Sequence, residues 1–300
     1  MSGKGTLVVV GGPTAAGKTP IAVSLAKHFG TEVISADSRQ FYHAMRIGTA
    51  RPTSAELQGV PHHFLGHLDL ETTWSAGEFA RAAEPVLQDL IHRNGHVILV
   101  GGSGLYIDAL IKGLDPLHLS DPRIRTVLQE RFREEGLSPL VEELRIRDEA
   151  TWRRIDRQNP HRVIRALEVC LASGRPFSEQ RTTPTDRKDL RIVRVAMEWP
   201  RAELYARIDR RVDGMMADGL LEEARSLLPY RELNALRTVG YRELFAHFDG
   251  EMTLEQAVSA IKQHTRNYAK RQVTWLRREA SWTSIPPEPK IAIQLVHGQG

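Results

Sequence analysis

The chain has 300 residues, of which 41% are hydrophobic and 26% are charged, so it is long enough for about two globular domains and is neither disordered nor fibrous. No apolar run approaches the roughly 20 residues of a membrane-spanning helix, and the first residues lack the pattern of a signal peptide. A single cysteine, Cys170, excludes an internal disulfide framework and a cysteine-based zinc site. These features predict a cytoplasmic enzyme or binding protein with no membrane partner.

The basic residues are more informative than the net charge of +4, because 33 of the 41 are arginine. The planar guanidinium group suits contacts with phosphates and base faces. Residues 145–165 hold seven arginines against three acids, and residues 262–279 hold six basic residues against one acid. This concentration indicates a polyanionic partner, with solvated helix faces as the alternative.

Short apolar runs alternate with helical patterns over residues 1–117. The runs at 7–10, 32–36 and 97–100 each predict a buried strand, with helices between them. This alternation is typical of a parallel sheet that helices cover on both faces. The first part of the chain is therefore predicted to have an α/β fold.

From about residue 120 the pattern becomes helical. Asp121-Pro122 and Asn159-Pro160 each combine a helix N-cap with a proline at the first helical position. The second of these helices has an apolar stripe that includes Cys170, which predicts a core position for the thiol, and Gly174 is its expected end.

The domain organisation follows from this change of pattern. We predict a helical insertion domain over residues 121–197 and a core domain made of residues 1–120 and 198–300. Residues 191–198 resemble a strand that returns to the sheet.

The last third of the chain is helical again. Thr253 and Gln256 form a capping box that predicts a helix running towards residue 279. The last fifteen or so residues are expected to form a poorly ordered tail. No coiled-coil pattern is present, which favours a monomer.

One motif predicts a phosphate site. The segment Gly12-Pro13-Thr14-Ala15-Ala16-Gly17-Lys18-Thr19 fits G-x-x-x-x-G-K-[ST], follows the 7–10 strand and opens a helix. In such a loop the backbone amides surround a phosphate chain, Lys18 neutralises it, and the Thr19 hydroxyl can ligate Mg²⁺. The motif indicates a P-loop NTPase-like parallel sheet flanked by helices, with a ligand-free glycine-rich turn as the alternative.

The residues after the other predicted strands refine this site. A kinase or ATPase would carry an acid after a second strand, but the 97–100 strand is followed by Gly101-Gly102-Ser103-Gly104. The acid is Asp37, after the 32–36 strand. Because ligands of open parallel sheets bind beyond the carboxyl ends of the strands, we expect the P-loop, Asp37 and Ser103 to converge. A helix N-cap or turn role is the alternative for Asp37.

Taken in order, these motifs resemble those of the tRNA dimethylallyltransferases, also called isopentenyl-diphosphate:tRNA transferases. The resemblance covers about residues 6–280. Its motifs are the P-loop, Asp37-Ser38-Arg39-Gln40 and the segments 48–52, 61–63, 101–106, 121–125, 162–168, 239–243, 265–266 and 269–275.

The resemblance implies a reaction. The dimethylallyl group of dimethylallyl diphosphate passes to N6 of adenosine 37, beside the anticodon, in tRNAs that read codons beginning with U. It implies that the P-loop holds the isoprenoid diphosphate and not ATP, in agreement with the missing strand-end acid. Asp37 would accept the amino proton, Lys18 would neutralise the leaving diphosphate, and Ser103 would orient a reactant. Ser103 and Ala16 depart from the threonine and serine that are usual in the family.

The resemblance also implies that the insertion and the C-terminal helix bind the tRNA anticodon stem-loop. The acceptor base must be flipped out of its stack, and Gln40 is suited to an adenine edge and Arg39 to the RNA backbone. The residues implied in tRNA binding are Asp37, Ser38, Arg39, Gln40, Ser103, Arg125, His161, Arg162, Val163, Ile164, Arg165, Arg237, Thr238, Val239, Gly240, Tyr241, Arg242, Lys270, Arg271, Gln272, Val273, Thr274, Trp275, Leu276 and Arg277.

Several of these residues have a simpler interpretation. Tyr268 and Trp275, seven apart on the predicted C-terminal helix, are either core residues or platforms for bases. Lys262, Arg266 and Lys270 step by four along the same helix and predict a basic face. His62 and His63 are interpreted as structural or substrate-shaping, because adjacent side chains of an extended segment point to opposite faces and cannot easily share one ion.

Two other functions compete with the transferase. A P-loop small-molecule kinase would use Asp37 to activate a hydroxyl, but it leaves the basic C-terminal helix without a purpose. An RNA-binding ATPase that only switches shape is disfavoured by the missing acid after the 97–100 strand.

Overall fold

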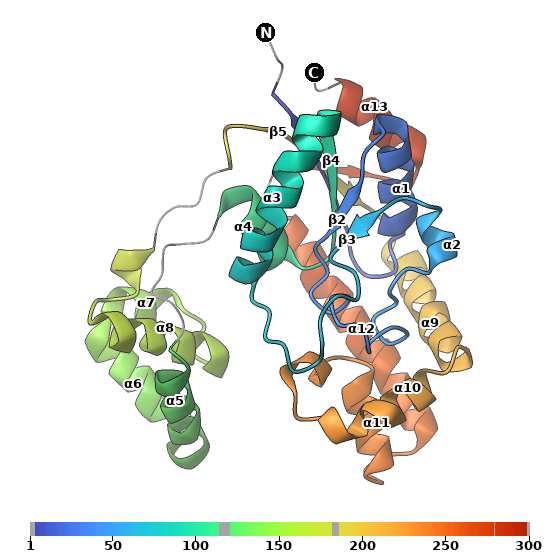
Figure 1. Ribbon diagram of the computed structural model, residues 1–300. Coiled ribbons are helices and arrows are strands. Elements are labelled where there is room, and N and C mark those ends of the chain that lie inside the picture. The colour runs from blue at the N-terminus through green and yellow to red at the C-terminus, as the bar shows by residue number, and fades with distance from the viewer. Residues whose placement is uncertain (1–3, 114–120, 182–185, 279, 299–300) are drawn as a thin grey trace. The chain divides into compact units, whose positions relative to one another are not determined.

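The computed structural model describes residues 4–113, 121–181, 186–278 and 280–298, and the chain divides into two compact units (Figure 1). The larger unit contains residues 1–111 and 187–300, and the smaller contains residues 112–186. The smaller unit is therefore inserted within the larger one. The predicted second boundary, after residue 197, was wrong, because residues 191–197 form a strand of the main sheet. The predicted first boundary, after residue 120, falls at the end of residues 114–120, which lie outside the described residues.

The larger unit is built on a six-stranded parallel sheet with the order β3-β2-β4-β1-β5-β6. In the central strand, Val8 is in register with Ile98 on one side and Val193 on the other. The strands predicted at 7–10, 32–36, 97–100 and 191–198 are thereby confirmed. The strands are β1 (Thr6–Gly11), β2 (Val33–Ser35), β3 (His62–His63), β4 (His96–Val100), β5 (Arg191–Met197) and β6 (Trp282–Ile285).

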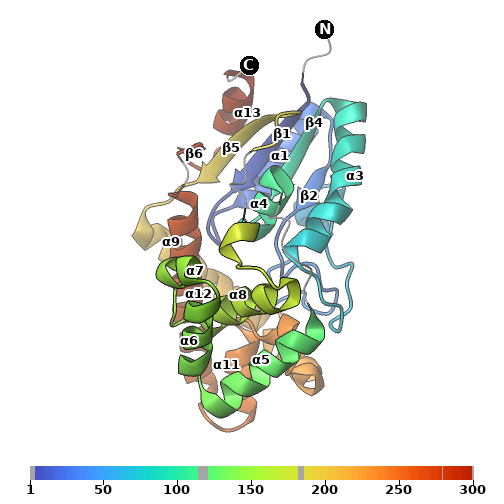
Figure 2. The ribbon, with the colours of Figure 1, turned by 90° about the vertical axis from the view of Figure 1, so that its left-hand side faces the viewer.

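Helices cover both faces of this sheet, as Figures 1 and 2 show. Leu7 and Val9 of β1 face a core shared with α3 (Ala76–Asn94) and α4 (Gly104–Lys112), whereas the alternate residues of β1 face α1 (Lys18–Phe29) and α13 (Pro289–Gly298). Both sets are buried because successive side chains of a strand point to opposite faces. The predicted α/β, P-loop-like architecture is confirmed.

The prediction of a poorly ordered C-terminal tail was wrong, because residues 289–298 form α13. Ala292 and Val296 lie one helical turn apart and are fully buried against the α1 side of the sheet. Ile291 and Leu295 pack on the same core and complete an apolar stripe at helical spacing. This short stripe is what fixes the end of the chain.

A group of helices packs beyond the carboxyl ends of the strands (Figure 1). The longest, α12, starts at the predicted capping box of Thr253 and Gln256. It packs against both α9 and α11. The group comprises α9 (Arg201–Ala217), α10 (Leu220–Leu227), α11 (Tyr241–Phe248) and α12 (Leu254–Leu276), while the short α2 (Ser54–Leu57) lies earlier in the chain.

The smaller unit is helical, as predicted. Asp121 and Asn159 cap α5 and α8, each followed by a proline, and Gly174 ends α8 in the left-handed conformation with φ 68°. Its core includes Leu128, Leu144 and Val163, and Cys170 is buried beside it. The helices are α5 (Pro122–Glu135), α6 (Ser138–Arg147), α7 (Glu149–Arg154) and α8 (Pro160–Ser173).

Within the described parts of the chain, none of the helices combines the length and the hydrophobicity that crossing a lipid bilayer requires.

Candidate active site

The loop between β1 and α1 is shaped to bind an anion. Gly12 and Gly17 have φ values of 152° and 84°, and Ala15 has a φ of 63°, so the backbone curls in a way that glycine permits at low cost. Gly17 caps α1 without a side-chain bond to the first turn. The amide groups that begin α1 are therefore free of side-chain caps, which is the arrangement that binds phosphate at helix N-termini.

The Lys18 ammonium group lies inside this loop. Its Nζ donates to the carbonyl oxygens of Gly12 at 3.1 Å and Pro13 at 2.9 Å. Burial lowers the pKa of Lys18 to about 8, an effect that the nearby Asp37 carboxylate opposes and Arg211 reinforces. At neutral pH the loop therefore holds a cation whose partners are two weak backbone acceptors, and a phosphate oxygen is a stronger partner for it.

Gln272 joins the P-loop to the segment after β4. Its Oε1 accepts the Thr14 N–H at 2.8 Å, and its Nε2 donates to the Gly102 carbonyl at 3.0 Å. The side chain is buried, and a Cβ at Gly102 would lie 2.3 Å from Nε2, so the close approach requires glycine there. Gln272, predicted to contact tRNA, thus holds two active-site loops at a fixed spacing.

Asp37 and Ser103 meet at the ends of β2 and β4. The Ser38 N–H donates to Ser103 Oγ at 3.1 Å, and the Arg39 N–H donates to Asp37 Oδ1 at 3.2 Å. The expected convergence of P-loop, Asp37 and Ser103 is present, and so is the turn role that was the alternative for Asp37. The two are compatible, since the turn fixes the carboxylate near the Lys18 cation.

Tyr268 of α12 completes this group. Burial together with the Asp37 charge raises the pKa of the phenol, and the Ser103 side chain opposes this shift. Of the two aromatic residues on this helix, Tyr268 is the one at the site. Trp275 is a core residue, because its indole N–H donates to Asp108 at 3.3 Å and its ring packs where a Cβ of Gly104 would lie 2.3 Å away.

Two arginines from α9 reach the P-loop and were missed in the sequence. Arg207 Nε donates to the Ala15 carbonyl at 2.8 Å while its guanidinium stacks 4.3 Å above the Trp199 ring. Arg211 lies 3.4 Å from Thr14 Oγ1. Their spacing of four residues places them on one helix face. That spacing was the available signal, but nothing in the sequence indicates which loop the face meets.

Gln40, predicted to bind the adenine edge, and Arg39, predicted to contact the RNA backbone, both donate to backbone carbonyls of the protein. Arg39 donates to the carbonyls of Asn234 and Ala235 at 2.9 and 3.0 Å. Gln40 Nε2 donates to the carbonyls of Thr49 and Ala50, both at 3.1 Å. The Arg39 guanidinium therefore anchors a loop, in addition to the RNA contact expected of it.

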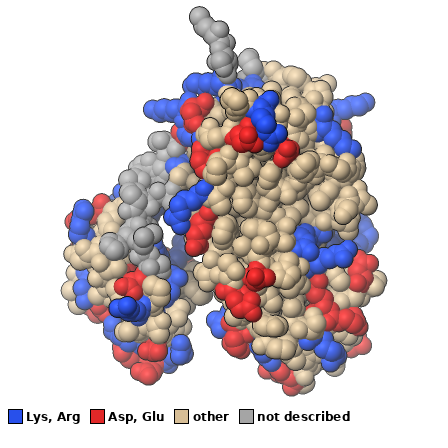
Figure 3. Space-filling view, in the orientation of Figure 1, with Lys and Arg blue, Asp and Glu red and all other residues tan. Residues whose placement is uncertain are grey.

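The predicted basic face of α12 is largely neutralised by α9. Lys262 pairs with Asp213 and Arg266 pairs with Asp209, each at 2.6 Å. Lys270, the third residue of this series, is exposed and belongs to neither pair. Figure 3 shows the same interspersion of acidic and basic side chains on the lower part of the larger unit. The other exposed members of the predicted tRNA set on this helix and after it are Arg271, Thr274 and Arg277, whereas Val273 is half-buried and Leu276 is buried.

The remaining predicted tRNA residues divide into exposed and buried groups. In the segment before α11, Arg237 and Arg242 are exposed, Thr238 and Val239 are half-buried, and Gly240 and Tyr241 are buried. In the smaller unit, Arg125, His161 and Arg162 are exposed, whereas Val163 and Ile164 belong to the core.

Arg165 of α8 has a structural partner. It lies 3.1 Å from the carboxylate of Glu168, which is fully buried, and Arg125 lies 3.2 Å from the same group. Both arginines therefore compensate a buried charge of the smaller unit.

The histidine pair on β3 fits the structural interpretation. His63 Nε2 lies 2.7 Å from Glu32, and His62 Nδ1 lies 3.0 Å from the Val60 carbonyl. Burial lowers the pKa of His62. Across the residues that the structure describes, no three His, Cys, Asp or Glu side chains cluster so as to hold a metal ion.

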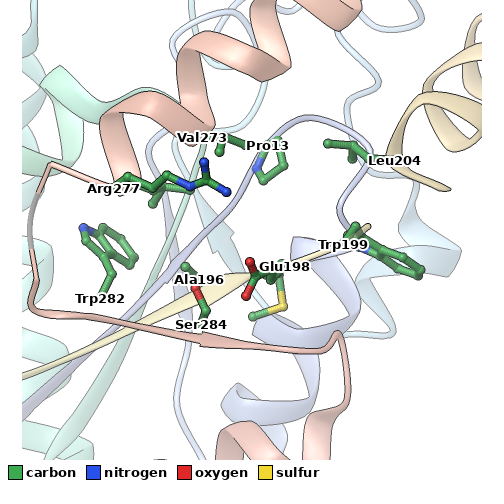
Figure 4. Close-up of a pocket in the computed structure, with 11 residues that line it drawn as sticks. Pro13, Ala196, Glu198, Trp199, Leu204, Val273, Arg277, Trp282 and Ser284 are labelled. Carbon is green, nitrogen blue, oxygen red and sulfur yellow. The ribbon is translucent and has the colours of Figure 1, made fainter. Parts of the chain in front are cut away.

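A cavity of about 190 Å³ lies between the P-loop and the ends of β5 and α12 (Figure 4). Its walls are mainly apolar, and the Arg277 and Glu198 side chains extend into it from α12 and from the end of β5. Because β5 and β6 lie on one side of β1 while β2 and β4 lie on the other, this cavity is separate from the Asp37 and Ser103 group. Its lining residues are Pro13, Ala196, Met197, Glu198, Trp199, Leu204, Val273, Leu276, Arg277, Trp282 and Ser284.

The fold and site define a P-loop-type enzyme core with a carboxylate, hydroxyl groups and arginines around a phosphate loop. The model of the IPP transferase family matches residues 40–279. The chain is 44% identical to tRNA dimethylallyltransferase 1 of Phocaeicola vulgatus over 293 residues, covering 97% of this chain and 98% of that one. It is 45% identical to the tRNA dimethylallyltransferase of Christiangramia forsetii over 286 residues, 95% of each chain.

A solved structure gives the same result. The tRNA isopentenylpyrophosphate transferase from Bacillus halodurans superposes with a TM-score of 0.71 at 35% identity, covering 99% of this chain and 95% of that one. The chain belongs to the IPP transferase family.

Proposed function

We propose that the protein is a tRNA prenyltransferase that moves the dimethylallyl group of dimethylallyl diphosphate to N6 of adenosine 37, in tRNAs that read codons beginning with U. The bond between the allylic C1 and the diphosphate oxygen breaks, the bond between C1 and N6 forms, and N6 loses a proton. The observation that carries this proposal is the placement of the Asp37 carboxylate beside a P-loop cation with no second strand-end acid after β4.

The residues of the site have separate tasks in this reaction. The adenine amino group is a weak nucleophile, and Asp37 accepts its proton as the new bond forms. Lys18, Arg207 and Arg211 neutralise the diphosphate as negative charge develops on it. Ser103, hydrogen-bonded to Ser38, orients the attacking amine or the diphosphate.

Magnesium fits this site as an ion held mainly by the diphosphate. Mg²⁺ prefers oxygen ligands and keeps several waters, so one hydroxyl beside bound phosphates is sufficient. Thr19, the residue after Lys18, would supply that hydroxyl. The ion would add positive charge to the leaving group.

Each unit carries its own group of exposed cations that we propose to contact tRNA. They lie on two parts of the chain, Arg125, His161 and Arg162 on the smaller unit and Arg242, Lys270, Arg271 and Arg277 on the larger. Contacts from arginine to phosphate position an anticodon stem-loop, while base contacts select it. We expect a cytoplasmic protein, since tRNA is the second substrate, and we also expect a monomer.

The test is transfer of labelled dimethylallyl diphosphate to unmodified tRNA in the presence of magnesium. We expect label at adenosine 37, and Asp37→Asn to lower kcat by about 10²–10⁴-fold while tRNA still binds. Asp69→Asn, on an exposed aspartate, is the matched control. Absence of label with phosphate release from ATP would favour the kinase or ATPase functions, and near-normal turnover of Asp37→Asn would remove Asp37 as the base.

A further inference from the structure

The carboxylate of Glu223 on α10 has a full set of donors outside the group around Asp37. Its Oε2 accepts the N–H groups of Arg46 and Ile47 at 3.0 and 2.8 Å. Its Oε1 accepts the Gly48 N–H at 2.9 Å and the Tyr241 hydroxyl at 2.7 Å. Three consecutive backbone amides that converge on one carboxylate hold the segment 46–48 in a single conformation.

Tyr241 and Gly48 make this contact tight. The Tyr241 ring is fully buried, and a Cβ at Gly48 would lie 2.6 Å from it. Burial and the Glu223 charge raise the pKa of the Tyr241 phenol, so its hydroxyl keeps its proton and acts as a donor. The loop therefore rests on an aromatic ring and on a charged acceptor at once.

The next two residues of the loop hold Gln40. The carbonyls of Thr49 and Ala50 both accept from Gln40 Nε2 at 3.1 Å, and Ala50 has a φ of 49°, in the left-handed region. A carbonyl can only accept, so the amide nitrogen must face these two oxygens. Both amide hydrogens are then used, and the group that Gln40 can offer a ligand is its oxygen.

We propose that Glu223 is a positioning residue that fixes the orientation of the Gln40 amide and so makes Gln40 selective for a base that carries an exocyclic amino group. This inference rests on the proposed function, in which Gln40 binds the adenine edge. The chain of contacts runs from the Glu223 carboxylate through the backbone of residues 46–50 to the Gln40 amide. An acceptor at that point pairs with the N6 amino group and has no partner on a purine that lacks it.

The experiment compares anticodon stem-loops that carry adenosine or purine riboside at position 37. Purine riboside lacks the amino group, so the ratio of the two Kd values reports the Gln40 contact. We expect the protein to bind the adenosine stem-loop about fivefold to tenfold more tightly, the worth of one hydrogen bond. In Glu223→Gln the ratio should fall to about twofold or less, because a neutral amide has one acceptor oxygen for two pairs of donors.

Three further variants separate positioning from general stability. Glu222→Gln, on the exposed neighbour, should keep the full ratio. Gln40→Ala should lose the ratio, and adding Glu223→Gln to it should change the ratio no further, as a double-mutant cycle requires when one residue acts through the other. Gly48→Ala, which pushes the loop off Tyr241, should lower the ratio with Glu223 intact, and it serves as the test if Glu223→Gln does not fold.

The inference is overturned if Glu223→Gln and Gly48→Ala weaken binding of both stem-loops equally and keep the ratio. It is also overturned if adding Glu223→Gln to Gln40→Ala changes the ratio of the two Kd values further. Transfer of label to the adenosine stem-loop by the unaltered protein is measured in parallel. Absence of transfer would contradict the proposed function. Normal transfer together with an unchanged Kd ratio in Glu223→Gln would overturn this inference alone.

Discussion

The Oε1 atom of Gln272 accepts the backbone N–H of Thr14 at 2.8 Å, which joins the last third of the chain to the phosphate loop at its beginning. The Nε2 atom of the same amide donates to the Gly102 carbonyl, so both the oxygen and the nitrogen of the amide are hydrogen-bonded. The helix proposed to contact tRNA is thereby part of the scaffold of the diphosphate site.

Replacement of Gln272 by alanine should damage both stability and substrate affinity. The change leaves a half-buried N–H and a buried carbonyl without their partner, which lowers the free energy of unfolding by about 1–3 kcal/mol. Because the P-loop then loses a fixed point, the KM for dimethylallyl diphosphate should rise several-fold. Chemical denaturation and steady-state kinetics measure the two effects. Gln263→Ala, on an exposed position of α12, should alter neither, and a normal KM in Gln272→Ala would contradict the role of the bridge.

The affinity for inorganic diphosphate should fall as the pH rises above 8. The pKa of Lys18 is lowered from 10.5 to about 8, mainly by burial, so the ammonium group begins to lose its proton there. Binding that requires the cation weakens by up to about tenfold per pH unit above that value. Titration calorimetry between pH 6.5 and 9.5 tests this. Lys18→Met should bind weakly with a flatter profile over this range, and a constant affinity up to pH 9.5 in the unaltered protein would contradict the assignment.

The lowered pKa of Lys18 affects stability in the opposite direction to ligand affinity as the pH rises. An unfolded lysine keeps its proton up to about pH 10.5, so between pH 8 and 10.5 the unfolded chain binds more protons than the folded one at this position. The contribution of Lys18 to the free energy of unfolding therefore rises with pH in that window, while ligand affinity falls.

Arg211→Ala and Arg210→Ala form a matched pair on α9. Arg211 is exposed but lies 3.4 Å from the Thr14 hydroxyl of the P-loop. Removal of this guanidinium should raise the KM for dimethylallyl diphosphate by about tenfold or more, as loss of a charge-assisted hydrogen bond does. Arg210 is exposed on the same helix, and its alanine variant should keep the normal KM. Equal effects of the two changes would indicate general electrostatics and not a contact.

The two arginines of α8 should behave differently. Arg162 is exposed, so Arg162→Ala should weaken tRNA binding and reduce the slope of log Kd against log salt by about 0.7–0.9 for each lost phosphate contact. Arg165→Ala should instead destabilise the smaller unit by about 3 kcal/mol, because it removes a partner of the fully buried Glu168. Fluorescence anisotropy at several salt concentrations and denaturation distinguish these outcomes. An unchanged salt slope in Arg162→Ala would exclude a phosphate contact there.

Local patterns predicted the elements and the phosphate loop well. Alternating apolar runs gave β1, β2, β4 and β5, and capping residues such as Asp121 and Asn159 marked the helix starts, because these signals act over a few residues. The convergence of the P-loop with Asp37 and Ser103 followed from a general property of parallel sheets.

Contacts between distant segments could not be predicted in the same way. The arginine at position 266 looks free in the sequence, but Asp209 neutralises it across two helices. Gln40 was singled out in the sequence, but nothing there connects it with Glu223, because the connection depends on the conformation of the loop between Arg46 and Ala50. Side-chain partners set by tertiary packing carry no local signature, and the same holds for the apolar stripe that docks α13.

The position of the insertion has a consequence for biosynthesis. β1 pairs with β4 and with β5, so residues 101–190 must leave the ribosome before the second edge of β1 acquires its partner. At about 5–20 residues per second, this interval lasts roughly 5–20 s. During that time the phosphate-loop strand presents an unpaired apolar edge, the kind of surface that recruits a chaperone or aggregates. Variants that slow folding of the smaller unit should therefore lower the yield of the whole enzyme, even where they leave every residue of the catalytic site unchanged.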